Sequence, residues 1–183
     1  MKYLLVELCM AAQVGTGTDI YGDTAYTQAQ RLYFAAVQAE TYVDKAVAAF
    51  QTLKRRYGEV PVIQAYLYGL LALQARYAFN PFKKAAYFQQ AVAGLDSLVN
   101  RYPSDPEVRF LRGTFYFYLP SFLGKRAEAQ KDISELTDLL LRYSPAYRAK
   151  YHPEILKAII DFLAGTGWVA KEKIAALRKL YGG

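Results

Sequence analysis

Arg109 and Arg112 are the residues whose type and spacing could most clearly do chemistry. They stand three positions apart, so a helix over this segment would place both guanidinium groups on one face. Such groups hold carboxylates and phosphates through paired hydrogen bonds, which predicts an anion site. The alternative is structural, because a buried arginine needs an acidic partner on a neighbouring element. The candidate partners are Asp96, Asp105, Asp132 and Glu135.

Aromatic residues suggest a second kind of site. Tyr68 and Tyr116 belong to a middle region dense in Tyr and Phe, where a peptide or a glycan could stack against the rings. The competing interpretation is that these rings fill the core, because four consecutive aromatic residues at 115–118 must point around a helix. Phe122 lies in the segment 119–124, which could be a partner-binding loop or a hydrophobic plug over the helix ends.

The C-terminal region is basic. From Arg142 onward there are eight Lys or Arg against three acidic residues, with tyrosines and Trp168 interleaved. This pattern is typical of a surface that binds RNA or an anionic membrane, and it is also typical of a capping helix with one docked and one solvated face. The basic patch candidates are Lys171, Lys173, Arg178 and Lys179.

Enzymatic chemistry finds little support in the sequence. Cys9 is the single cysteine and His152 the single histidine, so neither a cysteine cluster for zinc nor a histidine pair is available. The signatures of zinc proteases, serine hydrolases and phosphate-binding loops do not occur. We therefore predict no catalytic residues, no metal and no cofactor.

The composition is that of a folded domain. Of 183 residues 54% are hydrophobic and 15% aromatic, which is enough for one compact core. The net charge is +7, and residues 61–183 carry the whole excess. Residues 1–22 are predicted to be an N-terminal segment, and 23–183 a single helical-repeat domain. Met1–Ala12 resembles a short signal peptide interrupted by Glu7: if it is cleaved the protein is exported or periplasmic, and if it is retained the protein is cytoplasmic.

Periodic apolar residues separated by Pro and Gly predict an all-α fold. One stripe is Leu32, Ala35, Ala36 and Ala39, and the last helix carries the stripe Ala170, Ile174, Leu177 and Tyr181. The expected helices begin near 25, 43, 61, 81 and 106, then span 125–143, 155–163 and 168–181. Pro145 is expected to end the helix at 125–143, and 165–167 to form a turn.

The helices repeat in pairs. Ala46, Phe50 and Leu53 have the same spacing as Ala91, Leu95 and Leu98, and glycines recur in the first helices of two pairs at Gly69 and Gly113. This spacing is typical of tetratricopeptide-like hairpins, in which a small residue lets paired helices approach closely. It predicts a short α-solenoid of such hairpins with a C-terminal capping helix.

Residues 60–140 also resemble a family of uncharacterised bacterial tetratricopeptide-like helical-repeat proteins. The likeness rests on Asn80-Pro81 with Lys83-Lys84, on 106–112, on 119–123 and on 131–133. The resemblance implies a helical fold and often a secretory leader, and it implies no activity.

These observations predict a non-enzymatic scaffold whose concave helical surface binds a protein or peptide. The alternative is a basic module that binds RNA or anionic membrane through residues 142–181.

Overall fold

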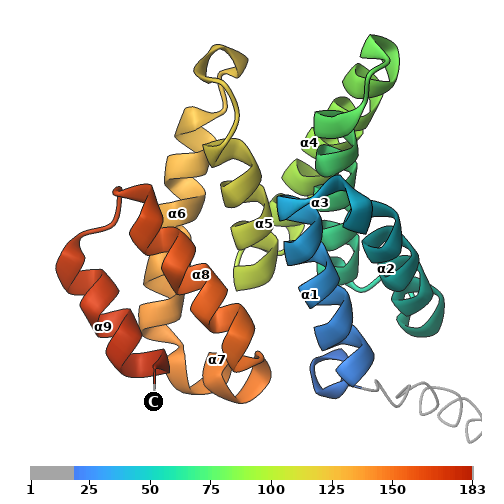
Figure 1. Ribbon diagram of the computed structural model, residues 1–183. Helices are drawn as coiled ribbons and strands as arrows, with labels where there is room; N and C mark the ends of the chain where they lie inside the picture. Colours follow the sequence, from blue (N-terminus) through green and yellow to red (C-terminus); the bar gives the residue numbers. More distant parts are fainter. Residues whose placement is uncertain (1–18, 183) are drawn as a thin grey trace, which may run out of the picture.

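The computed structural model describes residues 19–182, and this part of the chain is all-helical, as predicted (Figure 1). It contains nine α-helices, three short 3₁₀ turns and no strand among the described residues. The α-helices are α1 (Thr24–Gln38), α2 (Val43–Tyr57), α3 (Pro61–Tyr77), α4 (Pro81–Arg101), α5 (Pro106–Phe117), α6 (Arg126–Arg142), α7 (Ser144–Lys150), α8 (Pro153–Thr166) and α9 (Lys171–Tyr181). The 3₁₀ turns are η1 (Ile20–Gly22), η2 (Glu40–Tyr42) and η3 (Ser121–Leu123).

Local signals explain most helix ends. Asn80 and Asp105 cap α4 and α5, each accepting hydrogen bonds from two backbone N–H groups of the first turn. Prolines stand in the first turn of α3, α4, α5, α7 and α8, where a missing N–H removes no helical hydrogen bond. Gly58 and Gly167 follow α2 and α8 with positive φ of 77° and 70°, which glycine adopts without strain, and only Gly167 is in the left-handed helical conformation.

The helix before Pro145 ends as predicted, at Arg142. Pro145 itself stands in the first turn of α7, a helix that was not predicted. Two other local predictions were wrong. Residues 165 and 166 belong to α8, and the turn comes only at Gly167. The last helix begins at Lys171 instead of 168, because the Thr166 hydroxyl accepts a hydrogen bond from the Trp168 N–H and holds that residue outside the helix.

The buried face of α1 also differs from the predicted stripe. The predicted set was Leu32, Ala35, Ala36 and Ala39, and of these only Ala36 is fully buried. The buried residues are Tyr26, Ala29, Gln30, Tyr33 and Ala36. The prediction failed because it followed apolar residues alone, whereas this face buries polar side chains that find hydrogen-bond partners inside the protein.

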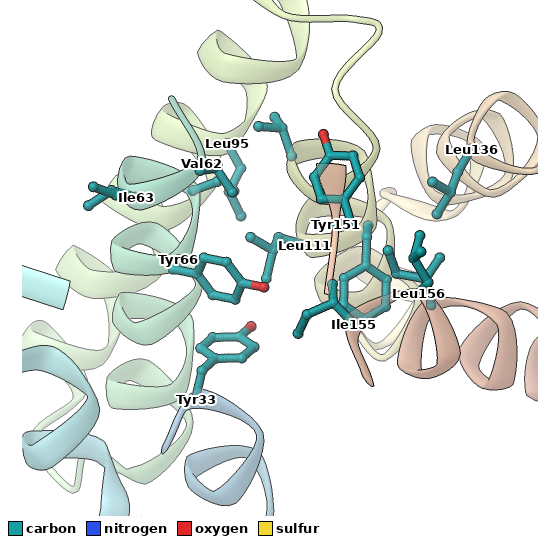
Figure 2. Packing of buried hydrophobic residues seen from close by; sticks show 14 of the residues in the cluster. Tyr33, Val62, Ile63, Tyr66, Leu95, Leu111, Leu136, Tyr151, Ile155 and Leu156 are labelled. Atoms are coloured by element: carbon teal, nitrogen blue, oxygen red, sulfur yellow. The ribbon is translucent and has the colours of Figure 1, made fainter. Parts of the chain in front are cut away.

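Helices adjacent in the chain pack against each other in pairs: α1 with α2, α3 with α4, α5 with α6, and α8 with α9. The links are short, so the members of each pair run antiparallel. The first helices of the pairs also touch in succession, α1 on α3, α3 on α5 and α5 on α8. One hydrophobic cluster runs through all of them, from Ile20 to Leu177 (Figure 2).

The N-terminal predictions fall largely outside the described residues, where Met1–Ala12 and Cys9 lie. Ile20 is buried in the core cluster, so folded structure begins before residue 23. None of the described helices combines the length and the apolar character that crossing a lipid bilayer requires.

Candidate functional site

Helix α5 carries two buried polar clusters. We call the first the arginine cluster: Arg109, Arg112, Asp96 and Asp132. Arg112 binds Asp132 with two hydrogen bonds, Nε to Oδ2 at 2.7 Å and Nη2 to Oδ1 at 2.8 Å. Its Nη1 donates to Asp96 Oδ1 at 2.9 Å, and Arg109 Nη1 donates to Asp132 Oδ1 at 2.9 Å. The cluster therefore ties α5 to both α4 and α6.

The charges at this cluster are balanced locally. Lys125 approaches Asp96 Oδ2 at 3.4 Å and Glu128 Oε1 at 3.2 Å, so three cations face three carboxylates. Tyr116 donates its hydroxyl hydrogen to Asp96 Oδ1 at 2.9 Å. This is the arrangement expected if the two arginines pair with acidic residues of neighbouring helices. Of the four candidate partners, the arginines contact Asp96 and Asp132. Asp105 caps α5 and Glu135 is exposed.

The second cluster, the Glu107 cluster, was not predicted from the sequence. The Glu107 carboxyl lies fully buried and accepts hydrogen bonds from two helices of the other half of the chain. Tyr26 Oη donates to Oε2 at 3.0 Å, Gln30 Nε2 to Oε1 at 2.6 Å, and Tyr66 Oη to Oε1 at 2.8 Å. The cluster thus joins α1, α3 and α5. Figure 2 shows the Tyr66 hydroxyl directed toward α5, beside Tyr33.

No cation takes part in the Glu107 cluster. Burial raises the pKa of Glu107 to about 8, and the nearby Asp105 carboxylate adds to the rise, while the three hydrogen bonds only partly oppose it. Burial also raises the pKa of Asp105, despite the two backbone N–H groups that it caps. At neutral pH the Glu107 carboxyl is therefore mostly protonated, and a tyrosine hydroxyl can accept its hydrogen.

Tyr68 lies in a different place, a groove between α2 and α3 with a volume of about 350 Å³. Its apolar lining includes Val47, Leu67 and Leu71, and its polar lining includes Gln51, Gln64 and Gln74. A methyl group on Gly94 of α4 would overlap the Tyr68 ring, so the glycine leaves the space that this ring occupies. We call this hollow the α2–α3 groove.

The five predicted partner-binding residues do not form one surface. Arg109, Arg112 and Tyr116 are buried in or beside the arginine cluster. Tyr68 lines the α2–α3 groove, and Phe122 is exposed on η3.

The four basic candidates near the C-terminus are all exposed: Lys171, Lys173, Arg178 and Lys179. Lys173 forms an ion pair with Asp138 of α6 at 2.9 Å, and it lines a hollow of about 390 Å³ with Trp168 and Thr137. Of the predicted apolar stripe, Ile174 and Leu177 are buried and the Tyr181 hydroxyl donates to the Leu140 carbonyl. Ala170, the fourth predicted member, precedes α9 and is exposed.

His152 caps α8, its Nδ1 accepting from the Glu154 N–H at 3.3 Å. Within residues 19–182, no three His, Cys, Asp or Glu side chains lie close enough together to hold a metal ion.

One sequence signal pointed toward the Glu107 cluster. Tyr26, Gln30 and Tyr33 share a face at i, i+4 and i+7, a polar stripe that is unusual for a helix with no charge on that face. The stripe does not name its acceptor, which lies 77 positions from Gln30 in the sequence.

No family model matches this chain, and neither does any curated protein or solved structure with which it was compared.

Proposed function

We propose that this protein is a non-enzymatic scaffold that binds an extended segment of a partner protein. In this proposal the chain is a short α-solenoid of tetratricopeptide-like helix hairpins, and α9 is its capping helix. The support is the order of packing, with four antiparallel pairs and with first helices that touch in succession. The likeness of residues 60–140 to bacterial tetratricopeptide-like proteins remains part of the proposal.

The observation that carries the proposal is the α2–α3 groove. Its apolar side chains can hold a hydrophobic side chain of the partner. Its three glutamines can donate to carbonyl groups and accept from N–H groups, which an extended segment presents unpaired along its backbone. The charged residues of the groove are balanced, because Lys54 pairs with Glu59 at 2.8 Å. This lining favours a polypeptide over a strongly charged ligand.

Tyr68 is the proposed anchor in the groove. It is half-buried, and its ring lies against Gly94 of α4, so the neighbouring helix limits how far it can move. An aromatic side chain held in this way offers a large contact area at a small loss of conformational entropy.

The test is selection of peptides from a random displayed library on the full chain, followed by titration of the selected peptides. We expect binders that lose affinity at least tenfold on Tyr68→Ala, because a truncated anchor typically costs more than about 1.4 kcal/mol. Backbone NMR shifts on peptide addition should map to α2 and α3.

Tyr102→Ala is the matched control, since Tyr102 is a partly exposed tyrosine at the far end of α4 and outside the groove. Its variant should bind the selected peptides as the native chain does. Peptides that bind with unchanged affinity to Tyr68→Ala, or a library that yields no binder, would contradict the proposal.

Salt separates this proposal from the alternative of RNA binding through residues 142–181. Binding to a single-stranded RNA probe would weaken steeply between low and moderate salt, because phosphate contacts release counterions. Binding of an uncharged peptide in the α2–α3 groove should change little over the same range.

A further inference from the structure

Two helix turns carry the most exposed aromatic side chains of the described chain. In the α3–α4 turn, Phe79 is 100% and Phe82 84% exposed. In the α5–α6 turn, Phe122 is 84% and Tyr118 72% exposed. Large apolar side chains grouped in this way on a soluble surface usually mark an interaction site. The core does not use them, so they need a separate explanation.

Both turns hold their rings on ordered backbone. Asn80 accepts hydrogen bonds from the N–H groups of Phe82 and Lys83 at 2.9 and 3.1 Å, which fixes the start of α4. In the second turn, η3 is closed by the N–H of Leu123 donating to the Pro120 carbonyl at 3.0 Å, and Gly124 reverses the chain with φ of 68°. The exposed rings are therefore presented on fixed turns, not on long loops.

The two turns lie at the same end of the molecule. Figure 1 shows the α3–α4 turn, in green, and the α5–α6 turn, in olive, both at the top of the view. The hairpins that carry them both extend toward that end and spread apart as they approach it, while α3 and α4 are both packed on α5. One extended surface can thus meet both turns, whereas neither turn alone forms a groove.

The surrounding charge is positive. Residues 60–95 hold three Lys or Arg and no acidic residue. Residues 108–127 hold four Lys or Arg and no acidic residue, but two of these, Arg109 and Arg112, are buried against Asp132 and Asp96. Lys83 and Lys84 are exposed directly beside Phe82. At the second turn the positive charge is partly neutralised, because Lys125 pairs with Asp96 and Glu128. The Arg126 guanidinium stacks over the Trp168 ring, 4.8 Å from its centroid. The α3–α4 turn is therefore the more basic of the two.

We propose that these two turns together dock the protein onto the surface of an anionic lipid bilayer. The rings of Phe79, Phe82 and Phe122 enter the headgroup region, where apolar side chains leave water, and Lys83 and Lys84 lie against lipid phosphates. Stable binding to a bilayer surface takes two signals, and apolar insertion with basic residues supplies both. A flat surface accommodates two separate turns at once, which a groove on a single protein partner does not.

The test is co-sedimentation of the full chain with vesicles. We expect binding to mixed phosphatidylcholine and phosphatidylserine vesicles, and much weaker binding to phosphatidylcholine alone. Phe79→Ser and Phe122→Ser should each weaken binding at least tenfold, because each removes one inserted ring. Lys83→Gln should weaken it about fivefold, and only on the anionic vesicles.

Insertion has its own readout. In Phe79→Trp and Phe122→Trp, the added indole emission should shift to shorter wavelength on anionic vesicles, because the ring leaves water. The native Trp168 is half-buried and present in every variant, so its emission is subtracted from each spectrum.

Tyr102→Ser and Arg101→Gln are matched controls. They remove a partly exposed ring and an exposed cation at the C-terminal end of α4, roughly 30 Å along the helix from the α3–α4 turn. Both controls should bind vesicles as the native chain does, and all variants should keep the native thermal midpoint because the substituted residues are exposed.

Three results would overturn the proposal. The first is no binding to anionic vesicles. The second is binding that survives both Phe79→Ser and Phe122→Ser. Such binding would mean that the protein attaches to the vesicle through other residues, for example 1–18 or the basic residues of α9. The third is competition by a single-stranded RNA probe that needs Lys83 and Lys84 but not the phenylalanines. None of these results bears on the α2–α3 groove, which uses other residues.

Discussion

The arginine cluster and the Glu107 cluster are both built on α5, where Glu107, Arg109 and Arg112 lie within six residues. Their electrostatics are opposite. In the arginine cluster every carboxylate faces a cation, with N–O distances of 2.7 to 3.4 Å. In the Glu107 cluster a carboxyl with no cation beside it is surrounded by two tyrosine hydroxyls and a glutamine amide. The first cluster joins α5 to α4 and α6, and the second joins α5 to α1 and α3.

The difference shows two ways of keeping polar groups inside a helical protein. In a cluster of paired charges each carboxylate has a cation beside it, and the cluster fails when one partner is removed. A lone buried carboxyl instead gives up its charge, and its contribution to folding then depends on pH. The two joints that hold α5 should therefore respond differently to the same perturbations.

The largest effect should come from Arg112→Met. This change leaves Asp132 buried with a single remaining arginine and takes one cation from Asp96. Removing one partner of a buried ion pair costs about 3–5 kcal/mol, so we expect a loss of this size in the free energy of unfolding, measured by urea denaturation.

Lys157→Met is the control, because Lys157 and Asp161 form an exposed pair on α8. It should leave the denaturation midpoint almost unchanged. A native-like midpoint for Arg112→Met would show that the arginine cluster does not hold the three helices together, and would reopen its interpretation as an anion site.

A smaller, pH-dependent effect should come from Glu107→Gln. The folded pKa of about 8 lies above the reference value of 4.5, so between these pH values unfolding releases a proton. The free energy of unfolding of the native chain then falls by at most about 1.4 kcal/mol per pH unit from this group, and glutamine removes that dependence. The advantage of the native chain over the variant should therefore shrink as pH rises from about 5 to 8, measured by urea denaturation at each pH.

Glu154→Gln is the matched control. The hydrogen bond from Arg31 lowers the pKa of Glu154, so its contribution to stability is complete above about pH 4.5 and is lost only as pH falls further. The difference between the native chain and this variant should stay constant between about pH 5 and 8. If Glu107→Gln also gave a constant difference, the carboxyl would be charged in the folded protein at neutral pH.

The smallest effect should come from Arg31→Met. Arg31 joins α1 to α8 through two hydrogen bonds to the Glu154 carboxylate, but the two side chains are 59% and 53% exposed. Water and salt screen such a pair, so we expect no measurable shift in the urea midpoint at moderate salt. A loss comparable to that of Arg112→Met would mean that exposure does not distinguish the ion pairs of this protein.

The sequence by itself determined the local structure. Periodic apolar residues separated by Pro and Gly predicted an all-α fold and most helix boundaries. These signals are local, because a helix is built from hydrogen bonds between residues four apart and its ends are set by the residues beside them. The start of α9 was predicted too early because the Thr166 hydroxyl holds Trp168 outside the helix. Helix α7 was missed because Pro145 stands in its first turn and was taken only as a helix end.

Only the tertiary structure decided which polar groups meet. The sequence analysis named four acidic residues as candidate partners of Arg109 and Arg112, and in the folded chain only Asp132 and Asp96 are paired with them. The polar stripe that begins at Tyr26 did not identify its acceptor, because Glu107 lies 81 positions later in the sequence. Partner choice depends on which helix faces come within hydrogen-bond distance, and burial then decides whether a carboxyl keeps its charge. Both depend on contacts between residues far apart in the chain, and no local pattern encodes them.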